Sequence, residues 1–107
     1  MGYREPGVAP MAGPFVLGID AGTGGCKAVA YDLDGRVVAE SFVEYPVLHP
    51  RVDWAEQDPM DWWNATVKAL RNVARRVAIE DIEALAVTSQ REAFTPLDAE
   101  GRVLANA

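Results

Sequence analysis

The sequence contains one cysteine and one histidine, and this scarcity limits the chemistry that it can support. A lone cysteine, Cys26, excludes a disulfide within the chain and favours a reducing compartment, so we expect a cytoplasmic protein. One cysteine and one histidine, His49, cannot assemble a protein-only zinc site of the usual kind. Cys26 needs no redox role, because small residues fit glycine-rich turns without one, and His49 is assigned no catalytic role.

Long apolar runs and an excess of basic residues are also missing. No apolar run approaches the ~20 residues of a membrane-spanning helix, so we expect no membrane association. The 107 residues include 10 lysines and arginines against 16 aspartates and glutamates, a formal net charge of −6. Arg71, Arg75 and Arg76 are better explained as charges at a helix C-terminus than as a basic patch. We therefore expect no nucleic-acid partner.

The chain is long enough for one hydrophobic core. Hydrophobic residues make up 50% of it, which suffices for one small domain and not for two. Residues 1–14 (MGYREPGVAPMAGP) are rich in glycine and proline and lack the apolar region of a signal peptide. We expect a disordered tail over residues 1–14 and one domain over residues 15–107, with either Met1 or Met11 as the true start.

Three strands joined by tight turns are predicted before the middle of the chain. Phe15–Ile19 is an apolar run, and Lys27–Asp32 alternates loosely between apolar and polar residues. An Asp34-Gly35 turn then leads into a third strand that ends at about Tyr45. Consecutive strands with such short connections predict an antiparallel meander.

A helix is predicted to begin at Asp58-Pro59. Aspartate can cap free amide groups there, and proline suits the first helical position. Apolar residues three or four apart then predict one buried stripe, which places Trp63 in the core. The stripe comprises Met60, Trp63, Val67, Leu70, Ala74 and Val77.

The remaining chain predicts a fourth strand and a second hairpin. Residues 82–90 (IEALAVTSQ) are nearly continuously apolar, as in strands that a parallel sheet buries on both faces. Residues 97–105 (LDAEGRVLA) repeat the turn chemistry of residues 33–39 (LDGRVVA). The order β-β-β-α-β followed by a hairpin predicts an α/β fold. One helix cannot cover both faces of a sheet, so we expect a fragment, or a domain whose other face is covered by further chain.

The segment at residues 17–37 (LGIDAGTGGCKAVAYDLDGRV) places an aspartate at a strand end, before a glycine-rich turn. Amides in such a turn converge on an anion, and missing side chains let phosphate oxygens approach closely. Asp20 is placed to hold Mg²⁺, and Thr23 adds a hydroxyl. A Walker A loop is excluded, because no serine or threonine follows Lys27 and the segment leads into a strand. A plain hairpin with an incidental aspartate stays open, and Lys27 either meets a phosphate or faces solvent.

Two further clusters are candidates for sugar contacts. Residues 88–94 (TSQREAF) follow the carboxyl end of a strand, where open α/β sheets bind ligands. Gln90, Arg91 and Glu92 offer donors and acceptors for vicinal hydroxyls, although polar residues that merely end a strand would show the same pattern. Trp54, in the connection before the helix, could stack on a sugar or pin that connection.

Three segments in this order resemble the N-terminal part of the FGGY carbohydrate kinases, which include glycerol, xylulose and ribulose kinases: GIDAGTGGCKAVAYDLDGRVV, WAEQDPMDWW and AVTSQREAFTPLDAEGRVL. The resemblance covers residues 15–107. It implies a partial N-terminal domain of the ribonuclease H-like, actin-like ATPase fold. It also implies phosphorylation of a sugar or polyol by the full-length protein, with ATP and Mg²⁺, and is compatible with a homo-oligomer.

The resemblance also implies roles for single residues. Asp20 would organise Mg²⁺-ATP, and the first phosphate loop would comprise Gly22, Thr23 and Gly24, with Lys27 beside it. Residues 90–92 match the segment that contacts polyol hydroxyls in glycerol kinases, and QREA there favours glycerol or autoinducer-2 kinases over xylulokinases. The family's catalytic base is an aspartate far downstream, so we expect no catalytic residue in this chain and no activity from it alone. A non-kinase actin-like nucleotide-binding or interaction domain is the alternative.

Overall fold

The apolar runs on either side of the helical segment form one mixed sheet in the computed structural model, which describes residues 9–107. Its strands are β1 (Phe15–Ala21), β2 (Gly25–Asp32), β3 (Val37–Glu44) and β4 (Ile82–Ser89), in the order β3-β2-β1-β4. The first three strands are antiparallel neighbours, and β4 joins β1 in parallel. This arrangement confirms the predicted meander and the order β-β-β-α-β.

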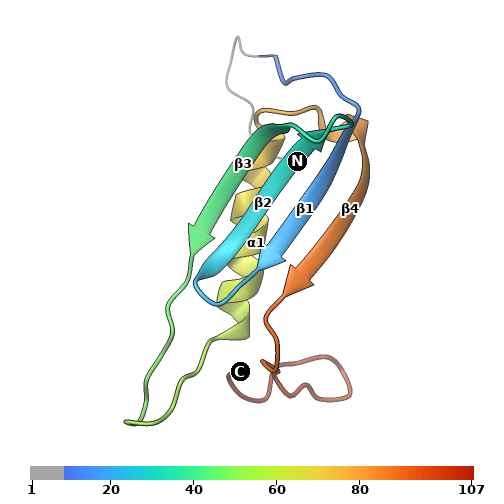
Figure 1. Ribbon diagram of the computed structural model, residues 1–107. Helices are drawn as coiled ribbons and strands as arrows, with labels where there is room; N and C mark the ends of the chain where they lie inside the picture. The colour runs from blue at the N-terminus through green and yellow to red at the C-terminus, as the bar shows by residue number, and fades with distance from the viewer. Residues whose placement is uncertain (1–8) are drawn as a thin grey trace.

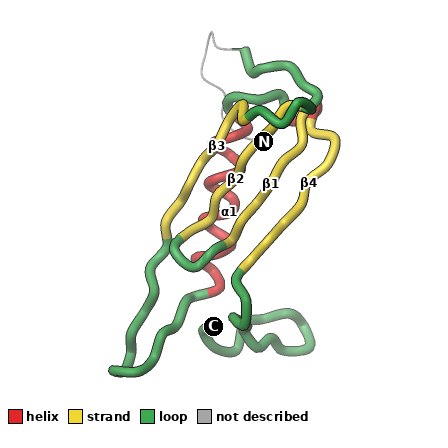
Figure 2. The backbone as a smooth tube through the Cα atoms, in the orientation of Figure 1, coloured by secondary structure: helices red, strands yellow, loops and turns green. Residues whose placement is uncertain are grey.

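Helix α1 (Pro59–Ala74) and the short 3-10 helix η1 (Ile79–Asp81) connect β3 to β4. Figure 1 shows α1 across one face of the sheet, and Figure 2 shows the long connections gathered beyond the strand ends. The predicted start of the helix is confirmed, since Asp58 Oδ1 accepts a hydrogen bond from the Met60 amide at 2.9 Å and Pro59 opens the first turn.

The core lies between α1 and the sheet. Alternate residues of β1 and β2 face the helix, and the helix meets them mainly with small side chains. Because alanines face the strands, the helix can lie close to the sheet. The buried cluster contains Phe15, Leu17, Ile19, Cys26, Ala28, Ala30, Ala39, Tyr45, Ala65, Ala69, Val73 and Val77.

The predicted stripe was wrong at Met60 and Trp63, whereas Val77 is buried and Leu70 packs against the core, as predicted. Trp63 and Met60 are 63% and 50% exposed, whereas Ala65, Ala69 and Val73 are buried, with Trp62 partly buried against the core. The residues that face the sheet also recur three or four apart, so periodicity allowed two adjacent stripes. Close packing favours the one with alanines, since the small side chains of Ala65 and Ala69 let the middle of the helix lie close to the strands.

The prediction that the fourth strand is buried on both faces was also wrong for the described chain. β4 is an edge strand that pairs with β1, and α1 packs chiefly on β2 and β3. Leu85 and Val87 are consequently 59% and 64% exposed. Hydrophobic composition identified the strand correctly but could not show what covers it.

The sequence predicts a disordered tail over residues 1–14, of which residues 1–8 lie outside the described residues. From Met11 the chain is held against the end of α1. The Met11 amide donates to the Arg76 carbonyl at 2.7 Å, and the Ala78 amide donates to the Met11 carbonyl at 2.8 Å. The Gly13 amide donates to Asp81 Oδ2 at 2.8 Å. Hydrogen bonds thus join residues 11 and 13 to the segment that follows α1.

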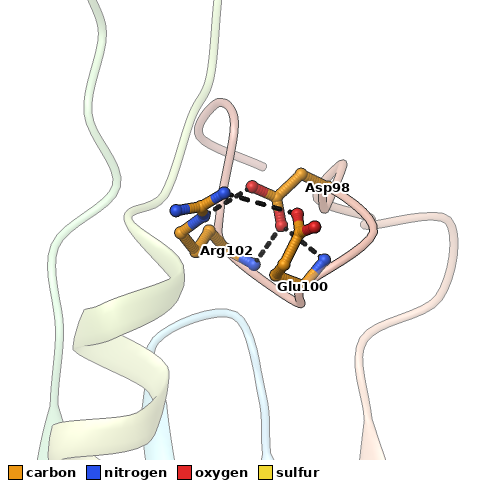
Figure 3. Close-up of polar contacts among 3 residues, drawn as sticks. All are labelled: Asp98, Glu100 and Arg102. Carbon is orange, nitrogen blue, oxygen red and sulfur yellow. Dashed lines mark hydrogen bonds and ion pairs between the residues drawn. The ribbon is translucent and has the colours of Figure 1, made fainter.

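The repeated turn chemistry appears in both hairpins. Asp98 accepts hydrogen bonds from the amides of Glu100 and Arg102 at 3.0 and 2.8 Å and from Arg102 Nε at 2.7 Å (Figure 3). These hydrogen bonds from Arg102 hold the pKa of Asp98 below its ordinary value. Asp32 accepts from two amides of the first turn in the same way, and Gly35 and Gly101 share φ = +83°. The second hairpin has a single isolated bridge, Leu97 to Val103, in place of paired strands.

Candidate functional site

The turn between β1 and β2 lies at the edge of the sheet where β1 and β4 also end (Figure 1). The Gly22 amide donates to the Gly25 carbonyl at 3.0 Å and closes the turn. Thr23 and Gly24 at its tip are exposed. Their amides have no hydrogen-bond partner within residues 9–107. The turn therefore presents two free donors at the sheet edge, as an anion-binding loop requires.

The glycines of this turn differ in what the fold demands of them. A Cβ at Gly25 would lie 2.5 Å from the Val43 carbonyl oxygen, so packing excludes any side chain there. A Cβ at Gly24 would meet no heavy atom within 4 Å, and neither Gly22 nor Gly24 has a positive φ. Within this turn, packing requires glycine at position 25 only. Glycine at position 24 instead suits close approach by a ligand.

Asp20 lies on the face of the sheet opposite α1. It is paired in register with Lys27 on β2 and Thr88 on β4, so the three side chains share that face. Lys27 Nζ is 3.7 Å from Glu40 Oε2, and both side chains are about half exposed. Asp20, Lys27 and Thr88 line a shallow hollow of about 350 Å³ next to the turn.

Asp20 has the donor chemistry of a magnesium ligand. No group of three or more histidine, cysteine, aspartate or glutamate residues that could enclose a metal ion occurs within residues 9–107. Mg²⁺ usually keeps several waters and binds through one or two carboxylates together with substrate phosphates. A single exposed aspartate beside an anion-binding turn fits that mode and does not fit an all-protein metal site.

A cavity of about 320 Å³ lies on the other side of the turn. Its volume is at the lower end of the range for small-molecule sites. The structure brings Thr23 of the turn and Gln90, Arg91 and Glu92 of the segment after β4 into its lining, together with Gln57, Trp62 and Phe94. Two clusters 67 residues apart in the sequence, at Thr23 and Gln90, thus share one cavity.

Trp54 does not line this cavity. The Arg51 guanidinium lies 4.6 Å from the centre of its ring, and His49 Nδ1 is 3.0 Å from its carbonyl oxygen. These contacts fit the role of pinning the connection between β3 and α1. The aromatic side chains that line the cavity are Trp62 and Phe94, whereas the sequence pattern favoured Trp54.

Glu92 has φ = +58°, the only positive φ at a non-glycine residue among residues 9–107. This left-handed conformation costs a residue with a Cβ roughly 1–2 kcal/mol. Backbone strain of this kind gathers at functional sites, where the surrounding structure enforces it.

Gln57 is the central hydrogen-bonding residue of the site, and sequence reasoning missed it. Its Nε2 donates to the Thr23 carbonyl at 2.6 Å, and its Oε1 accepts from Trp62 Nε1 at 2.9 Å and from Gln90 Nε2 at 2.7 Å. At 6% exposed, it is the only buried polar side chain among residues 9–107. A glutamine outside any periodic element carries no sequence signal of burial.

Tyr45 was likewise predicted only as the end of a strand. Its hydroxyl donates to the Gly22 carbonyl, and its ring belongs to the core. Burial, and secondarily the nearby Cys26 and Asp20 side chains, raise the pKa of Tyr45 above its ordinary value. The phenol is therefore a neutral donor, and its hydrogen bond to the Gly22 carbonyl fixes that part of the turn.

Comparisons with known proteins show which family the chain resembles. Residues 15–107 match the model of the FGGY family of carbohydrate kinases, N-terminal domain. The chain is 39% identical over 88 residues to a xylulose kinase of Escherichia coli, and this match covers 82% of this chain and 18% of that protein. It is 38% identical over 93 residues to a glycerol kinase of Aquifex aeolicus, covering 86% of this chain and 19% of that protein.

Solved structures give the same result. A gluconate kinase from Lactobacillus acidophilus superimposes with a TM-score of 0.80 at 28% identity, over 86% of this chain and 18% of that one. A xylulose kinase from the same organism superimposes with a TM-score of 0.80 at 27% identity, over 90% and 19%. The chain thus spans about a fifth of the length of these relatives.

Proposed function

The chain belongs to the FGGY family of carbohydrate kinases, to its N-terminal domain, and from this we propose that the full-length protein transfers a phosphoryl group from ATP to a hydroxyl of a sugar or polyol. The sheet and helix form part of the N-terminal domain of the ribonuclease H-like, actin-like ATPase fold, as predicted. Homologues with carbohydrate kinase names support the reaction class.

The observation that carries this proposal is the shared cavity. Thr23, in the turn with two free amides, and the polar segment at residues 90–92 line the same space. Phosphoryl transfer depends mainly on holding donor and acceptor in line and on neutralising charge. A phosphate-binding turn that borders a hydroxyl-binding segment meets the first requirement.

On the ATP side, the Thr23 and Gly24 amides would hold phosphate oxygens, with Gly22 closing the turn. Asp20 would bind Mg²⁺ on the opposite side of the turn. The bound ion would supply charge neutralisation for the phosphates. Lys27 would approach the same phosphates from the hollow that it shares with Asp20, because its exposed ion pair with Glu40 is weak enough to exchange.

On the acceptor side, Gln90, Arg91 and Glu92 would bind hydroxyls in the cavity. Both xylulose and glycerol kinases match at nearly equal identity, so the preference of QREA for a glycerol-like substrate stays a prediction. A sugar contact by Trp54 also stays a prediction. The catalytic base would lie outside these 107 residues, so the chain alone would be inactive.

The cellular setting is proposed on narrower grounds. No helix among residues 9–107 is long and apolar enough to cross a membrane. A cytoplasmic location and a homo-oligomeric full-length protein stay predictions from the sequence, as does the lack of a nucleic-acid partner.

The test is a screen of the full-length protein against polyols and ketoses, with ATP consumption as the readout. We expect one class to stimulate consumption, and we expect Asp20→Ala to lower that rate by roughly 100-fold. Asp34→Ala, at an exposed turn aspartate remote from the cavity, is the control and should keep the wild-type rate. A rate within a few-fold of wild type for Asp20→Ala would refute the metal role. ATP binding without sugar-dependent consumption would favour the non-kinase nucleotide-binding domain.

A further inference from the structure

Two consecutive carbonyls of the β1–β2 turn are held by side chains from other parts of the chain. The Gly22 carbonyl accepts from Gln90 Nε2 at 3.0 Å and also from the Tyr45 hydroxyl. The Thr23 carbonyl accepts from Gln57 Nε2 at 2.6 Å. Both carbonyls are therefore directed into the protein, toward buried or half-buried donors.

This fixes the direction of the two free amides. The carbonyl of Gly22 and the amide of Thr23 belong to one peptide unit, and the carbonyl of Thr23 and the amide of Gly24 belong to the next. In a planar trans peptide the N–H points opposite to the C=O. Because both carbonyls are held inward, the Thr23 and Gly24 amides point outward. Neither of these two amides has a hydrogen-bond partner among residues 9–107.

The orientation of the Gln57 amide is itself determined. The indole of Trp62 can only donate, so the atom of Gln57 that lies 2.9 Å from Trp62 Nε1 must be the carbonyl oxygen. The amino group must then face the Thr23 carbonyl. Trp62 thereby determines which end of the Gln57 amide faces the Thr23 carbonyl, although Trp62 does not contact that carbonyl.

Gln90 links the turn to the cavity. Its amino group donates both to Gln57 Oε1 at 2.7 Å and to the Gly22 carbonyl at 3.0 Å. One residue of the predicted hydroxyl-binding segment thus uses both of its protons to hold the turn. A shift of that segment would loosen one of the two anchored peptide units.

We propose that Gln57 is a positioning residue for the phosphate-binding turn: its side chain holds the Thr23 and Gly24 amides outward and ties the turn to Gln90. The inference rests on the proposed function, since it assigns these amides to phosphate oxygens. The main chain of Gln57 is held separately, by two hydrogen bonds with Ala107 of 3.0 and 2.9 Å. A substitution at position 57 therefore acts chiefly through the side-chain contacts.

The experiment measures MgADP binding by calorimetry, and KM and kcat for ATP, in the full-length protein. Gln57→Glu keeps the side-chain size but sets an oxygen against the Thr23 carbonyl. We expect the Kd for MgADP and the KM for ATP to rise roughly tenfold or more, because misdirected amides lose hydrogen bonds to a charged ligand. Trp62→Phe removes the donor that orients Gln57 while it keeps an aromatic ring at that position, and a smaller rise in the same direction is expected.

Asn72→Asp is the matched control. It makes the same amide-to-acid change at a half-buried residue near the opposite end of α1, where Asn72 Nδ2 donates to Ser41 Oγ at 2.9 Å. Its Kd and KM should equal those of the wild-type protein. A purely structural role for Gln57 would lower the amount of active protein, and hence the apparent kcat, without moving Kd or KM.

The outcomes separate this inference from the function on which it rests. Suppose that the wild-type protein binds MgADP and that Gln57→Glu and Trp62→Phe bind it with the same Kd. This result would overturn the positioning role and leave the proposed function standing. Absence of MgADP binding by the wild-type protein would overturn the proposed function and the inference with it. If Gln57→Glu fails to fold, the Kd of Trp62→Phe decides.

Discussion

At the scale of single residues, neighbouring glycines in the β1–β2 turn have different reasons to be glycine. A side chain at Gly25 would collide with the Val43 carbonyl and the Phe42 ring, whereas space is open beside Gly24. The constraint at position 25 comes from packing inside the sheet. The constraint at position 24 would come from the ligand, because nothing in the described protein occupies that space.

Substitution by alanine should separate the two. Gly25→Ala should lower the free energy of unfolding by about 1–3 kcal/mol through overpacking. Gly24→Ala should change it by less than about 0.5 kcal/mol, as at other open surface positions. Gly24→Ala should nevertheless weaken MgADP binding by the full-length protein, because a methyl group would stand beside the free amides.

Urea denaturation of both variants provides the first measurement and calorimetry with MgADP the second. Equal loss of stability in the two variants would contradict the steric distinction. Unchanged binding in Gly24→Ala would contradict close approach of the ligand at this position.

At the scale of secondary-structure elements, the site depends on contacts between the ends of elements and the turn. Tyr45 follows β3, Gln57 precedes α1, and Gln90 follows β4, and all three donate to carbonyls of residues 22 and 23. Because these donors come from separate elements, the turn keeps one conformation only while all of those elements are in place.

Tyr45→Phe should show this dependence as a function of pH. Loss of the hydroxyl removes its hydrogen bond to Gly22 and should cost about 1 kcal/mol near neutral pH. The pKa of Tyr45 is raised in the folded protein from an ordinary value of 10.0. The unfolded chain therefore ionises first, and the stabilisation, complete below pH 10.0, declines as the pH rises above it.

The measurement is the free energy of unfolding of both proteins from pH 7 to about 11. The difference between them should narrow above pH 10.0, where the wild-type protein loses the contribution that the phenylalanine variant already lacks. The other tyrosines titrate in both proteins and cancel in the comparison. A constant difference across the range would contradict a raised pKa for Tyr45.

The elements also show where sequence patterns suffice. Apolar runs with a turn residue between them located all four strands to within a few residues, and Asp58-Pro59 marked the start of α1. The sequence pattern could not predict which side of that helix faces the sheet, because two adjacent stripes were both apolar. Tertiary packing chose between them through the small volume of Ala65 and Ala69.

At the scale of the whole molecule, the described chain has two layers of unequal extent. Helix α1 covers β2 and β3 but leaves β4 at an open edge (Figure 1). Ile19 and Val87 illustrate this inequality, since they are register partners on the same face. Ile19 is 7% exposed and Val87 is 64% exposed.

Truncation of these partners should give unequal effects in the 107-residue chain. Ile19→Ala should lower the free energy of unfolding by about 2–5 kcal/mol, because it leaves a cavity beneath the helix. Val87→Ala should lower it by less than about 1 kcal/mol, since it loses only strand propensity at an exposed edge. Urea denaturation followed by tryptophan fluorescence measures both. A comparable loss in the two variants would contradict the exposure of β4.

The sequence by itself determined the strands, the helix start, the two aspartate-glycine turns and the candidate residues at Asp20, Thr23 and residues 90–92. Each of these depends on local periodicity, capping or turn chemistry, which neighbouring residues express directly. Only the tertiary structure decided that Thr23 and Gln90 share a cavity, that Trp62 and not Trp54 faces it, and that Gln57 holds the turn. Those contacts join residues more than 30 positions apart, and their hydrogen bonds form only once the sheet and helix bring separate chain ends to one edge.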